Sequence, residues 1–445
     1  MNKHYVLKNF FKYVSLNVIG MIGLSCYILA DTFFVSNALG SNGLAALNFS
    51  IPIYCIINGL GLMIGIGGAT KYSILKSQNE DEKANSIFSN TVIVGIVIGI
   101  IMSIVGIFLS TTIAKLLGAE GATLTMSSTY LTTILCFSPF FILNNIMLAF
   151  IRNDGNPRLS MVAMLIGSFS NIVLDYIFIF PFSMGMFGAA FATGLAPIIS
   201  LCILSSHFIK QKNNFKLIKC KINIKIIINI LGLGLSAFIT EISSGIVLII
   251  FNLVILDITG VVGVAAYGIV ANVALVVVSI FTGISQGIQP LISEGYGKND
   301  SILMKQVLKY AITLSLCIAT IIYILTFLLS YNIIAIFNSE NNVELIPIAI
   351  NGLRIYFTGF FFAGPNIIIA AFLSATTRMK SAFVVSIMRG CIAIIPILLL
   401  LTAFLGMNGV WLSFTFAEII TTITATIFLS KLKPKVQNNG EIMNY

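Results

Sequence analysis

Long apolar runs separated by short polar segments make up almost the whole chain. A helix needs about 20 mostly apolar residues to cross the hydrocarbon core of a bilayer. The pattern therefore predicts an all-α integral membrane protein with twelve transmembrane helices. The predicted spans are residues 13–36, 48–74, 86–110, 128–150, 160–181, 188–208, 226–251, 261–289, 307–330, 347–374, 382–404 and 409–430.

The positions of lysine and arginine test this count. If the N-terminus is cytoplasmic, the outward loops contain only Lys115, Arg354 and Arg389 fall within spans, and every other basic residue lies on the inward side. One missed or added span would scramble this asymmetry, so charge predicts an even number of spans with both termini cytoplasmic. We expect Arg354 and Arg389 to snorkel towards an interface, with pairing to Glu241 as the alternative.

The composition excludes a soluble globular protein. Hydrophobic residues make up 58% of the chain, charged residues 9%, and the mean hydropathy is +1.03. The net charge of +10 sits in short loops, so membrane orientation explains it better than nucleic-acid binding does. The first apolar run is too long for a signal-peptide core. The seven scattered cysteines have no CxxC spacing, which argues against a disulfide framework or a zinc site.

The two halves of the chain resemble each other. "GLAALNFS" at 43–50 is similar to "GVAAYGIV" at 263–270, and "GMFGAA" at 185–190 is similar to "GMNGVW" at 406–411. Six spans per half is an even number, so both halves enter the membrane from the same side. The sequence thus predicts a parallel repeat of two pseudo-symmetric six-helix bundles about an axis along the membrane normal.

This repeat divides the chain into predicted domains. An N-terminal six-helix lobe covers residues 1–209, and a basic cytoplasmic linker covers 210–225. A C-terminal six-helix lobe covers 226–432, followed by a cytoplasmic tail at 433–445.

Acidic residues inside predicted spans mark a candidate site. A carboxylate at bilayer depth costs several kcal/mol, so Asp31 in the first span needs a reason. In the fifth span, Asn171 and Asp175 are four residues apart and share one helical face. Asp31 lies roughly 9 Å below the outer end of its span, and Asp175 and Thr193 lie at similar depth, with Asn171 one turn deeper. These four residues are the predicted cation-binding site.

The chemistry of this layer leaves two coupling ions open. A lone Asn or Thr in a membrane helix is usually a structural hydrogen-bonding group, but two aspartates at matched depth favour a functional site. Two adjacent carboxylates disfavour the doubly ionised state in a low dielectric, so the pair can load and release H⁺. The same oxygens suit Na⁺, a hard cation. The sequence indicates no cofactor besides the coupling ion.

Further polar groups within spans are weaker candidates. Glu241, near the middle of the seventh span, is either a second cation or substrate carboxylate or a structural partner of another polar group. Further residues that could line a cavity are Gln286, Gln289, Asn144, Asn145 and Asn17. The glycine-rich "GLGLMIGIGGAT" at 59–70 lies inside a hydrophobic helix without a following Lys-Ser/Thr pair, so it is not a nucleotide-binding loop.

Taken together, the chain resembles the multidrug and toxic compound extrusion (MATE) family of the MOP superfamily, especially its bacterial DinF-like and MepA-like branch. The resemblance rests on Asp31 followed by "TFFVSNALGSNGLAAL", on "FSIPIY" in the second span, on "GNPR" after the fourth and on "NIVLD" in the fifth. It implies a V-shaped exporter. It also implies an N-lobe cation site at positions that match Asp31, Asn171, Asp175 and Thr193.

The resemblance is incomplete in the second half. Other family members use carboxylates on the seventh and tenth helices; Glu241 matches the first of these, but the tenth span has no acid. A C-lobe cation site is therefore in doubt.

These observations predict a secondary active exporter rather than an enzyme. We expect Na⁺- or H⁺-coupled antiport of amphipathic, mostly cationic small molecules by alternating access. We further expect a monomer in the bacterial cytoplasmic membrane, with the lipid bilayer as a partner and no nucleic acid. A lipid-linked precursor flippase would need cationic side chains in its cavity, and a membrane-embedded lipid transferase would need an acidic metal motif or a nucleophile in an interfacial loop. A channel is compatible with composition alone.

Overall fold

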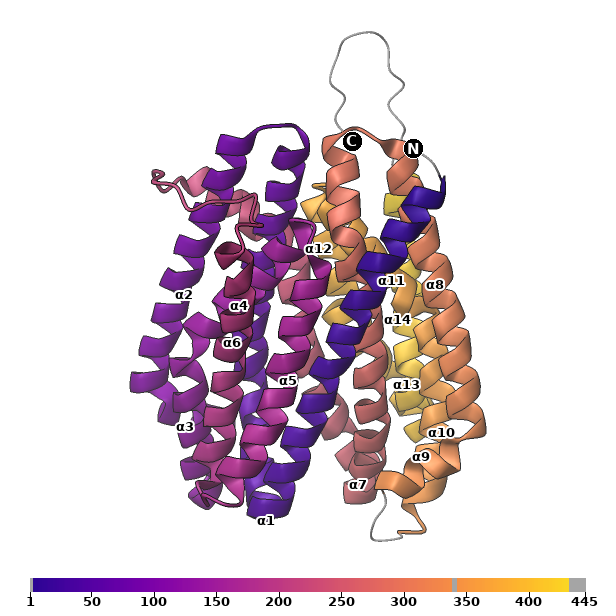
Figure 1. Cartoon of the computed structure of the whole chain (residues 1–445). Coiled ribbons are helices and arrows are strands. Elements are labelled where there is room, and N and C mark those ends of the chain that lie inside the picture. The colour runs from indigo at the N-terminus through magenta and orange to yellow at the C-terminus, as the bar shows by residue number, and fades with distance from the viewer. Residues whose placement is uncertain (1–2, 338–341, 432–445) are drawn as a thin grey trace. The chain divides into compact units, whose positions relative to one another are not determined.

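The computed structural model describes residues 3–337 and 342–431, and this part of the chain is built from helices without a strand (Figure 1). The predicted tail at 433–445 lies outside the described residues. In chain order the elements are α1 (Lys3–Ser77), α2 (Asp81–Leu116), α3 (Gly121–Cys136), α4 (Ser138–Asn153), α5 (Pro157–Ile179), α6 (Gly185–Ile209), α7 (Ile224–Gly297), α8 (Ser301–Leu328), α9 (Ser330–Phe337), α10 (Leu345–Tyr356), η1 (Phe357–Gly359), α11 (Phe360–Ala375), α12 (Met379–Ile387), η2 (Met388–Ile392), α13 (Ile394–Leu405) and α14 (Met407–Ser430).

The predicted all-α membrane fold is confirmed. Nine helices of the described chain are long and apolar enough to cross a membrane, and α3 and α4, bent by 49°, together make another crossing. The helices α1 and α7 each contain two predicted spans. Splitting both therefore accounts for the twelve predicted crossings within residues 3–337 and 342–431.

Each of the two long helices is broken at one glycine. Gly40 in α1 has φ 62° and ψ −155°, and Gly260 in α7 has φ 63° and ψ −156°. Residues with a side chain are almost excluded from this region of backbone space, so each turn between consecutive spans depends on glycine. The two breaks are 220 residues apart, which is the spacing of the repeat predicted from "GLAALNFS" and "GVAAYGIV".

Other backbone turns repeat with nearly the same spacing. Asn79 and Asn299, which follow α1 and α7, have φ of 61° and 56°. Gly185 and Gly406, which precede the last helix of each half, have φ of 57° and 53°. Left-handed turns thus occur at corresponding positions of the two halves, as expected of a chain that contains an internal repeat.

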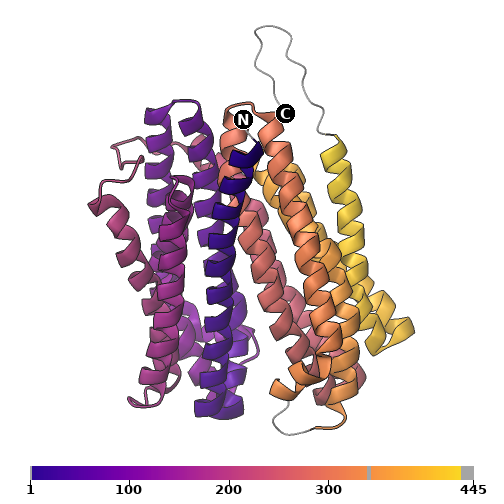
Figure 2. The same cartoon turned by 45° about the vertical axis from the view of Figure 1, so that its right-hand side comes forward.

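The chain forms two compact units that do not coincide with the two sequence halves. The first unit is Ser15–Gly245, and the second combines the described residues of Met1–Val14 and Ile246–Tyr445. Within the first unit the helices run roughly parallel in both views (Figures 1 and 2). The lobes predicted from the repeat follow sequence similarity, whereas these units follow packing, so the predicted lobe boundaries stay a prediction.

The start of α7 packs against the second part of α1 inside the first unit. A Cβ atom on Gly234 would lie 1.8 Å from the Met63 carbonyl oxygen, and one on Gly67 would lie 1.9 Å from the Ile230 carbonyl oxygen. Small residues at such crossings let membrane helices approach through their backbones. The second unit has a related contact, because a Cβ on Gly287 of α7 would lie 2.7 Å from the Cα of Val14 in α1.

Candidate functional site

The predicted cation-site residues all lie buried in the first unit. Asp31 is on α1, Asn171 and Asp175 are on α5, and Thr193 is on α6. Helix α5 is fixed at its start by Asn156, whose side chain accepts a hydrogen bond from the Leu159 N–H, as expected of an N-cap. The site therefore draws on three helices of one compact unit.

Hydrogen bonds join the α5 and α6 residues of the site. In one orientation of its side-chain amide, Asn171 Nδ2 donates to Thr193 Oγ1 at 3.3 Å. With its amide turned over, Asn171 Nδ2 donates to Asp175 Oδ2 at 3.0 Å, and its oxygen accepts from the Thr193 N–H at 3.2 Å. The turned orientation satisfies both ends of the amide, so it is the one favoured by the hydrogen-bond network. Asn171 and Asp175, expected from their i, i+4 spacing to share one helical face, are thus joined by a hydrogen bond in this orientation.

The two aspartates interact electrostatically, and each has an unsatisfied oxygen among the described residues. Asp31 and Asp175 lie close enough for their charges to interact. Each keeps its Oδ1 atom buried and without a hydrogen-bond partner among the described residues. Because a buried acceptor left unpaired is costly, this arrangement fits a site completed by a proton or a cation. Two carboxylates with amide and hydroxyl oxygens suit a hard cation. The described residues contain no cluster of three or more His, Cys, Asp or Glu side chains that could hold a metal ion.

Three buried or partly buried tyrosines near the aspartates, Tyr27, Tyr54 and Tyr130, were not predicted from the sequence. Tyr27 lies one helical turn before Asp31 on α1, and its hydroxyl is 2.6 Å from that of Tyr54. Tyr27 and Tyr130 both interact electrostatically with Asp31 and Asp175. The i, i+4 spacing of Tyr27 and Asp31 is a signal that could have identified the first of them.

Glu241 belongs to the same unit and joins an amide chain. Its Oε1 atom accepts from Asn58 Nδ2 at 2.9 Å, and Asn58 Oδ1 accepts from Asn145 Nδ2 at 3.1 Å. Glu241 also interacts electrostatically with Tyr27 and Tyr54. Glu241 is therefore next to the aspartate layer, although the repeat assigns its helix to the C-terminal half.

The weaker candidates are dispersed. Asn144 is adjacent to Asn145 and has a buried Oδ1 without a partner among the described residues. Asn17 accepts a 2.9 Å hydrogen bond from Arg152 Nη1 on α4. Gln286 and Gln289 are buried on the part of α7 that belongs to the second unit.

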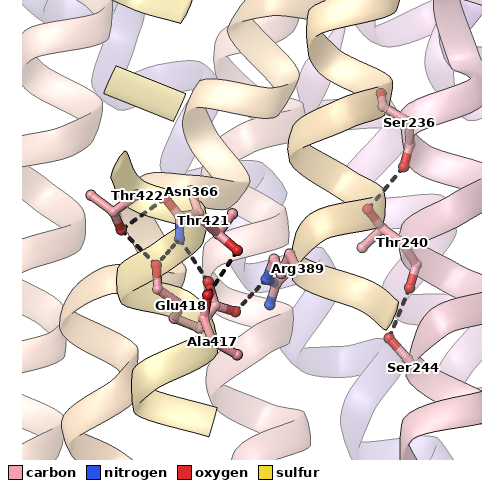
Figure 3. A network of polar contacts seen from close by, with 9 residues as sticks. All are labelled: Ser236, Thr240, Ser244, Asn366, Arg389, Ala417, Glu418, Thr421 and Thr422. Carbon is pink, nitrogen blue, oxygen red and sulfur yellow. Dashed lines mark hydrogen bonds and ion pairs between the residues drawn. The ribbon is translucent and has the colours of Figure 1, made fainter. Parts of the chain in front are cut away.

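The second unit contains a buried ion pair. Arg389 Nε donates to Glu418 Oε1 at 2.6 Å, with 14% and 2% of the two side chains exposed. Asn366 Nδ2 donates to Glu418 Oε2 at 2.7 Å, and Thr422 Oγ1 donates to Asn366 Oδ1 at 3.1 Å. Figure 3 shows Glu418 between Asn366 and Arg389. Arg389 thus pairs with an acid instead of snorkelling, so that expectation was wrong, and its partner is not Glu241.

Glu418 satisfies the criterion that identified Asp31, since it is an acid inside a predicted span, yet the sequence analysis passed over it. Its negative charge is offset by Arg389, which distinguishes it from the aspartate layer. Arg354, the other arginine within a span, lies over the Phe327 ring at 4.5 Å from its centroid, a cation–π contact. The hydroxyls of Thr240 and Ser244, also drawn in Figure 3, bond only to carbonyls one turn earlier on α7.

Comparison with known proteins agrees with this architecture. Residues 18–177 and 236–400 match the sequence profile of the family described as MatE. The multidrug export protein MepA of Staphylococcus saprophyticus is 28% identical over 421 residues, 94% of this chain and 92% of the relative. MepA of Staphylococcus aureus is 28% identical over 423 residues, with the same coverage.

Solved structures share the fold. An outward-facing multidrug resistance MATE transporter of the MOP superfamily superposes with a TM-score of 0.90 at 22% identity, covering 96% of this chain and 97% of that one. A MOP superfamily transporter from Pyrococcus furiosus, described as having a binding pocket of reverse polarity that suggests a different function, gives 0.89 at 21% identity and 95% coverage of both chains. At these identities the likeness shows the fold alone.

Proposed function

Because the chain belongs to the MatE family, a family of membrane transporters rather than enzymes, we propose that it is a secondary active exporter of small amphipathic, mostly cationic organic compounds. Inward movement of Na⁺ or H⁺ drives this export in antiport. The two MepA relatives bear the name of multidrug export proteins, which supports a broad range of small organic substrates.

The observation that carries the proposal is the pair of unpartnered oxygens on Asp31 and Asp175. Ionised together in a dry site, the two carboxylates repel each other, and a proton or Na⁺ between them relieves that repulsion. Asn171 holds Asp175 in position through its amide. A site that binds one cation strongly when accessible from outside, and releases it when accessible from inside, can couple its passage to export.

Alternating access supplies the order of events. When the site is accessible from outside, a cation binds the aspartates and favours release of the substrate. When the site is accessible from inside, the cation leaves for the cytoplasm and the ionised aspartates favour substrate binding. The membrane potential contributes about 2.3 kcal/mol per charge per 100 mV to each inward cation movement.

Dye transport tests this mechanism, measured either in inverted membrane vesicles or with the purified protein in reconstituted vesicles. An imposed Na⁺ gradient and an imposed pH gradient are applied separately to the wild type, Asp31→Asn and Asp175→Asn. We expect one of the two gradients to drive transport by the wild type. In each variant the gradient-driven rate should be at least about tenfold lower, because the variant lacks a carboxylate that the ion needs.

Asp257→Asn is the matched control, because it makes the same chemical change on the part of α7 that belongs to the second unit. It should retain the wild-type rate. Full gradient-driven transport by both site variants would overturn the assigned cation site. If neither gradient drives transport by the wild type, coupled export itself is wrong.

Sidedness and assembly complete the proposal. The protein acts as a monomer in the bacterial cytoplasmic membrane with both termini in the cytoplasm, as the distribution of lysine and arginine favours. A flippase for a lipid-linked phosphate would need an available cation within the membrane, but Arg389 is neutralised by Glu418 and Arg354 lies over the Phe327 ring. Amphipathic cations are therefore the better match.

A further inference from the structure

The segment between α6 and α7, residues 210–223, is a strap fixed to the surface of the first unit. It has no helix of its own, and Figure 1 shows it extended beside one end of α2. Together with the first turn of α7 it contains six lysines and no acidic residue: Lys210, Lys212, Lys216, Lys219, Lys221 and Lys225. The sequence predicts a linker here, and the structure gives it a defined path.

The first part of the strap is anchored on the turn between α4 and α5. The Asn214 N–H donates to Asp154 Oδ2 at 2.9 Å. Asp154 also binds the Tyr72 hydroxyl at 2.8 Å and His207 Nε2 at 2.9 Å. Next along the chain, Phe215 is fully buried among aromatic rings, with the Phe88 ring 4.5 Å away between centroids. The strap therefore cannot swing freely at this end.

The second part of the strap follows the first turns of α2. Backbone N–H groups of the strap donate to α2 side chains: Lys216 to Asn85 Oδ1 at 2.9 Å, Ile218 to Ser89 Oγ at 2.9 Å, and Asn223 to Asn90 Oδ1 at 3.3 Å. Because these bonds come from the backbone, they do not use the lysine side chains of the strap.

The depth of the strap follows from α2. The exposed large apolar residues of this helix begin at Ile96 and Val97 and continue through Leu109 to Leu116, as expected for a face in contact with lipid tails. Ile96 is six residues, about 9 Å, beyond Asn90, and eleven residues, about 16 Å, beyond Asn85. The headgroup region adds about 5 to 8 Å on each side of the hydrocarbon core, so the strap runs from the aqueous side down to the outer edge of the headgroup region beside Asn90.

The exposed side chains of the strap match that location. Leu217 and Ile222 are 67% and 66% exposed, and the lysines between them, Lys219 and Lys221, are exposed as well. Apolar side chains alternate with cations, a composition typical of surfaces that insert into the lipid interface and bind phosphate.

We propose that the strap is a binding surface for anionic phospholipid headgroups. The ammonium groups of Lys216, Lys219 and Lys221 bind the lipid phosphates at the outer edge of the headgroup region, while the exposed Leu217 and Ile222 add apolar contact with the same lipids. The positive-inside distribution explains why lysines lie on this side of the membrane. It does not explain an ordered strap that holds them beside exposed apolar residues next to the headgroup region.

Lipid retention tests the proposal independently of transport. The protein is reconstituted into nanodiscs of phosphatidylcholine with phosphatidylglycerol, extracted into detergent, and examined by native mass spectrometry for bound lipid. The test variant is Lys216→Gln/Lys219→Gln/Lys221→Gln, and the control is Lys298→Gln/Lys305→Gln/Lys309→Gln, which removes the same charge from α8 and the turn before it. We expect the test variant to retain about tenfold less phosphatidylglycerol than the wild type, and the control to retain wild-type amounts.

A second variant separates the contribution of the exposed apolar side chains from that of the lysine charges. Leu217→Asn/Ile222→Asn keeps all lysines and should also lower retention, while its thermal unfolding in lipid-free detergent stays unchanged because both side chains are exposed. Wild-type retention in the lysine test variant, or an equal loss in the control, would overturn the proposal. Equal retention of phosphatidylcholine and phosphatidylglycerol by the wild type would do the same. None of these outcomes bears on the aspartate site.

Discussion

A carboxylate inside a membrane protein needs something nearby to offset its lost hydration, and this chain does so in two different ways. Glu418 has a guanidinium partner in Arg389 and an amide partner in Asn366. Asp31 and Asp175 instead interact electrostatically with each other, and each keeps one oxygen without a hydrogen-bond partner among the described residues. The first arrangement is complete as it stands, whereas in the proposed mechanism a cation completes the second. This contrast is why we propose a structural role for Glu418 and a functional one for the two aspartates.

Removing one member of the complete pair should destabilise the fold. Glu418→Gln leaves Arg389 buried and unpaired, which costs about 3–5 kcal/mol of unfolding free energy. We expect a clear drop in the thermal unfolding temperature in detergent. The double variant Glu418→Gln/Arg389→Gln removes both charges and should recover most of the loss. If the single and double variants unfold at the same temperature, the ion pair is not what stabilises this region.

Glu241 should affect which substrates are exported. Glu241→Gln keeps an oxygen that accepts the Asn58 hydrogen bond but removes the negative charge. A charge pair at about 4 Å contributes about 1 kcal/mol even in water, so the apparent affinity for monovalent cationic dyes should fall at least about fivefold. Affinity for neutral substrates should change little. The exposed Glu344→Gln is the control, and an equal loss for cationic and neutral compounds would assign Glu241 a structural role instead.

Sequence reasoning found the acidic layer because charge in an apolar span is conspicuous and helix depth can be counted. It could not find Tyr54 or Asn58, since these residues are ordinary in a membrane helix and become part of the site only through contacts between helices distant in sequence. It also left the partner of Arg389 undefined, because nothing in the sequence states which helix packs against which. Residue identity and depth were predictable, but side-chain pairing was not.

At the scale of elements, the crossing of α7 over α1 depends on the absence of side chains. The backbones approach so closely at Gly67 and Gly234 that a Cβ atom on either would overlap a carbonyl oxygen. Backbone atoms cannot move aside as a flexible side chain can. The two helices would have to separate to admit even one methyl group.

Gly234→Ala should therefore destabilise the first unit although alanine is the better helix former. Overpacking typically costs about 1–3 kcal/mol, and rigid backbone neighbours place this site at the upper end. Gly268→Ala on the same helix is the control, since its Cβ would meet no atom within 4 Å and should be neutral or slightly stabilising. Thermal unfolding in detergent compares them. Equal stability of the two variants would mean that the α1–α7 contact is looser than the structure shows.

Some element boundaries could not be predicted from the hydropathy pattern. The apolar pattern predicts one span over 128–150, but the structure divides this crossing into α3 and α4, with Pro139 at the start of α4. Proline lacks the backbone N–H that a continuing helix would need. The small helix α9 was not predicted either, because its eight residues are too few to register as a span.

At the scale of the whole molecule, neither sequence half contains a complete unit. The first unit needs residues of α7 up to Gly245, and the second needs residues of α1 up to Val14. The repeat predicted two lobes in sequence order. It could not predict this exchange, because the exchanged segments are as apolar as their neighbours.

Splitting the chain in the strap tests the exchange. Fragments 1–219 and 220–445, expressed together, should co-purify and unfold at nearly the temperature of the intact protein, since each supplies a segment that the other requires. A second fragment shortened to begin at residue 246 should pair poorly, and affinity purification through a tag on the first fragment measures the difference. Stable, independent folding of fragment 1–219 alone would contradict the exchange.

The exchange also has a consequence for synthesis. Residues 3–14 leave the ribosome well before the surface around Gly287 that Val14 contacts, which is made some 270 residues later. At roughly 5 to 20 residues per second, this start of α1 waits about 15 to 55 seconds for its final neighbour. During that interval the membrane itself, or an insertion chaperone, must shelter the segment, so a part made early is among the last to reach its native place.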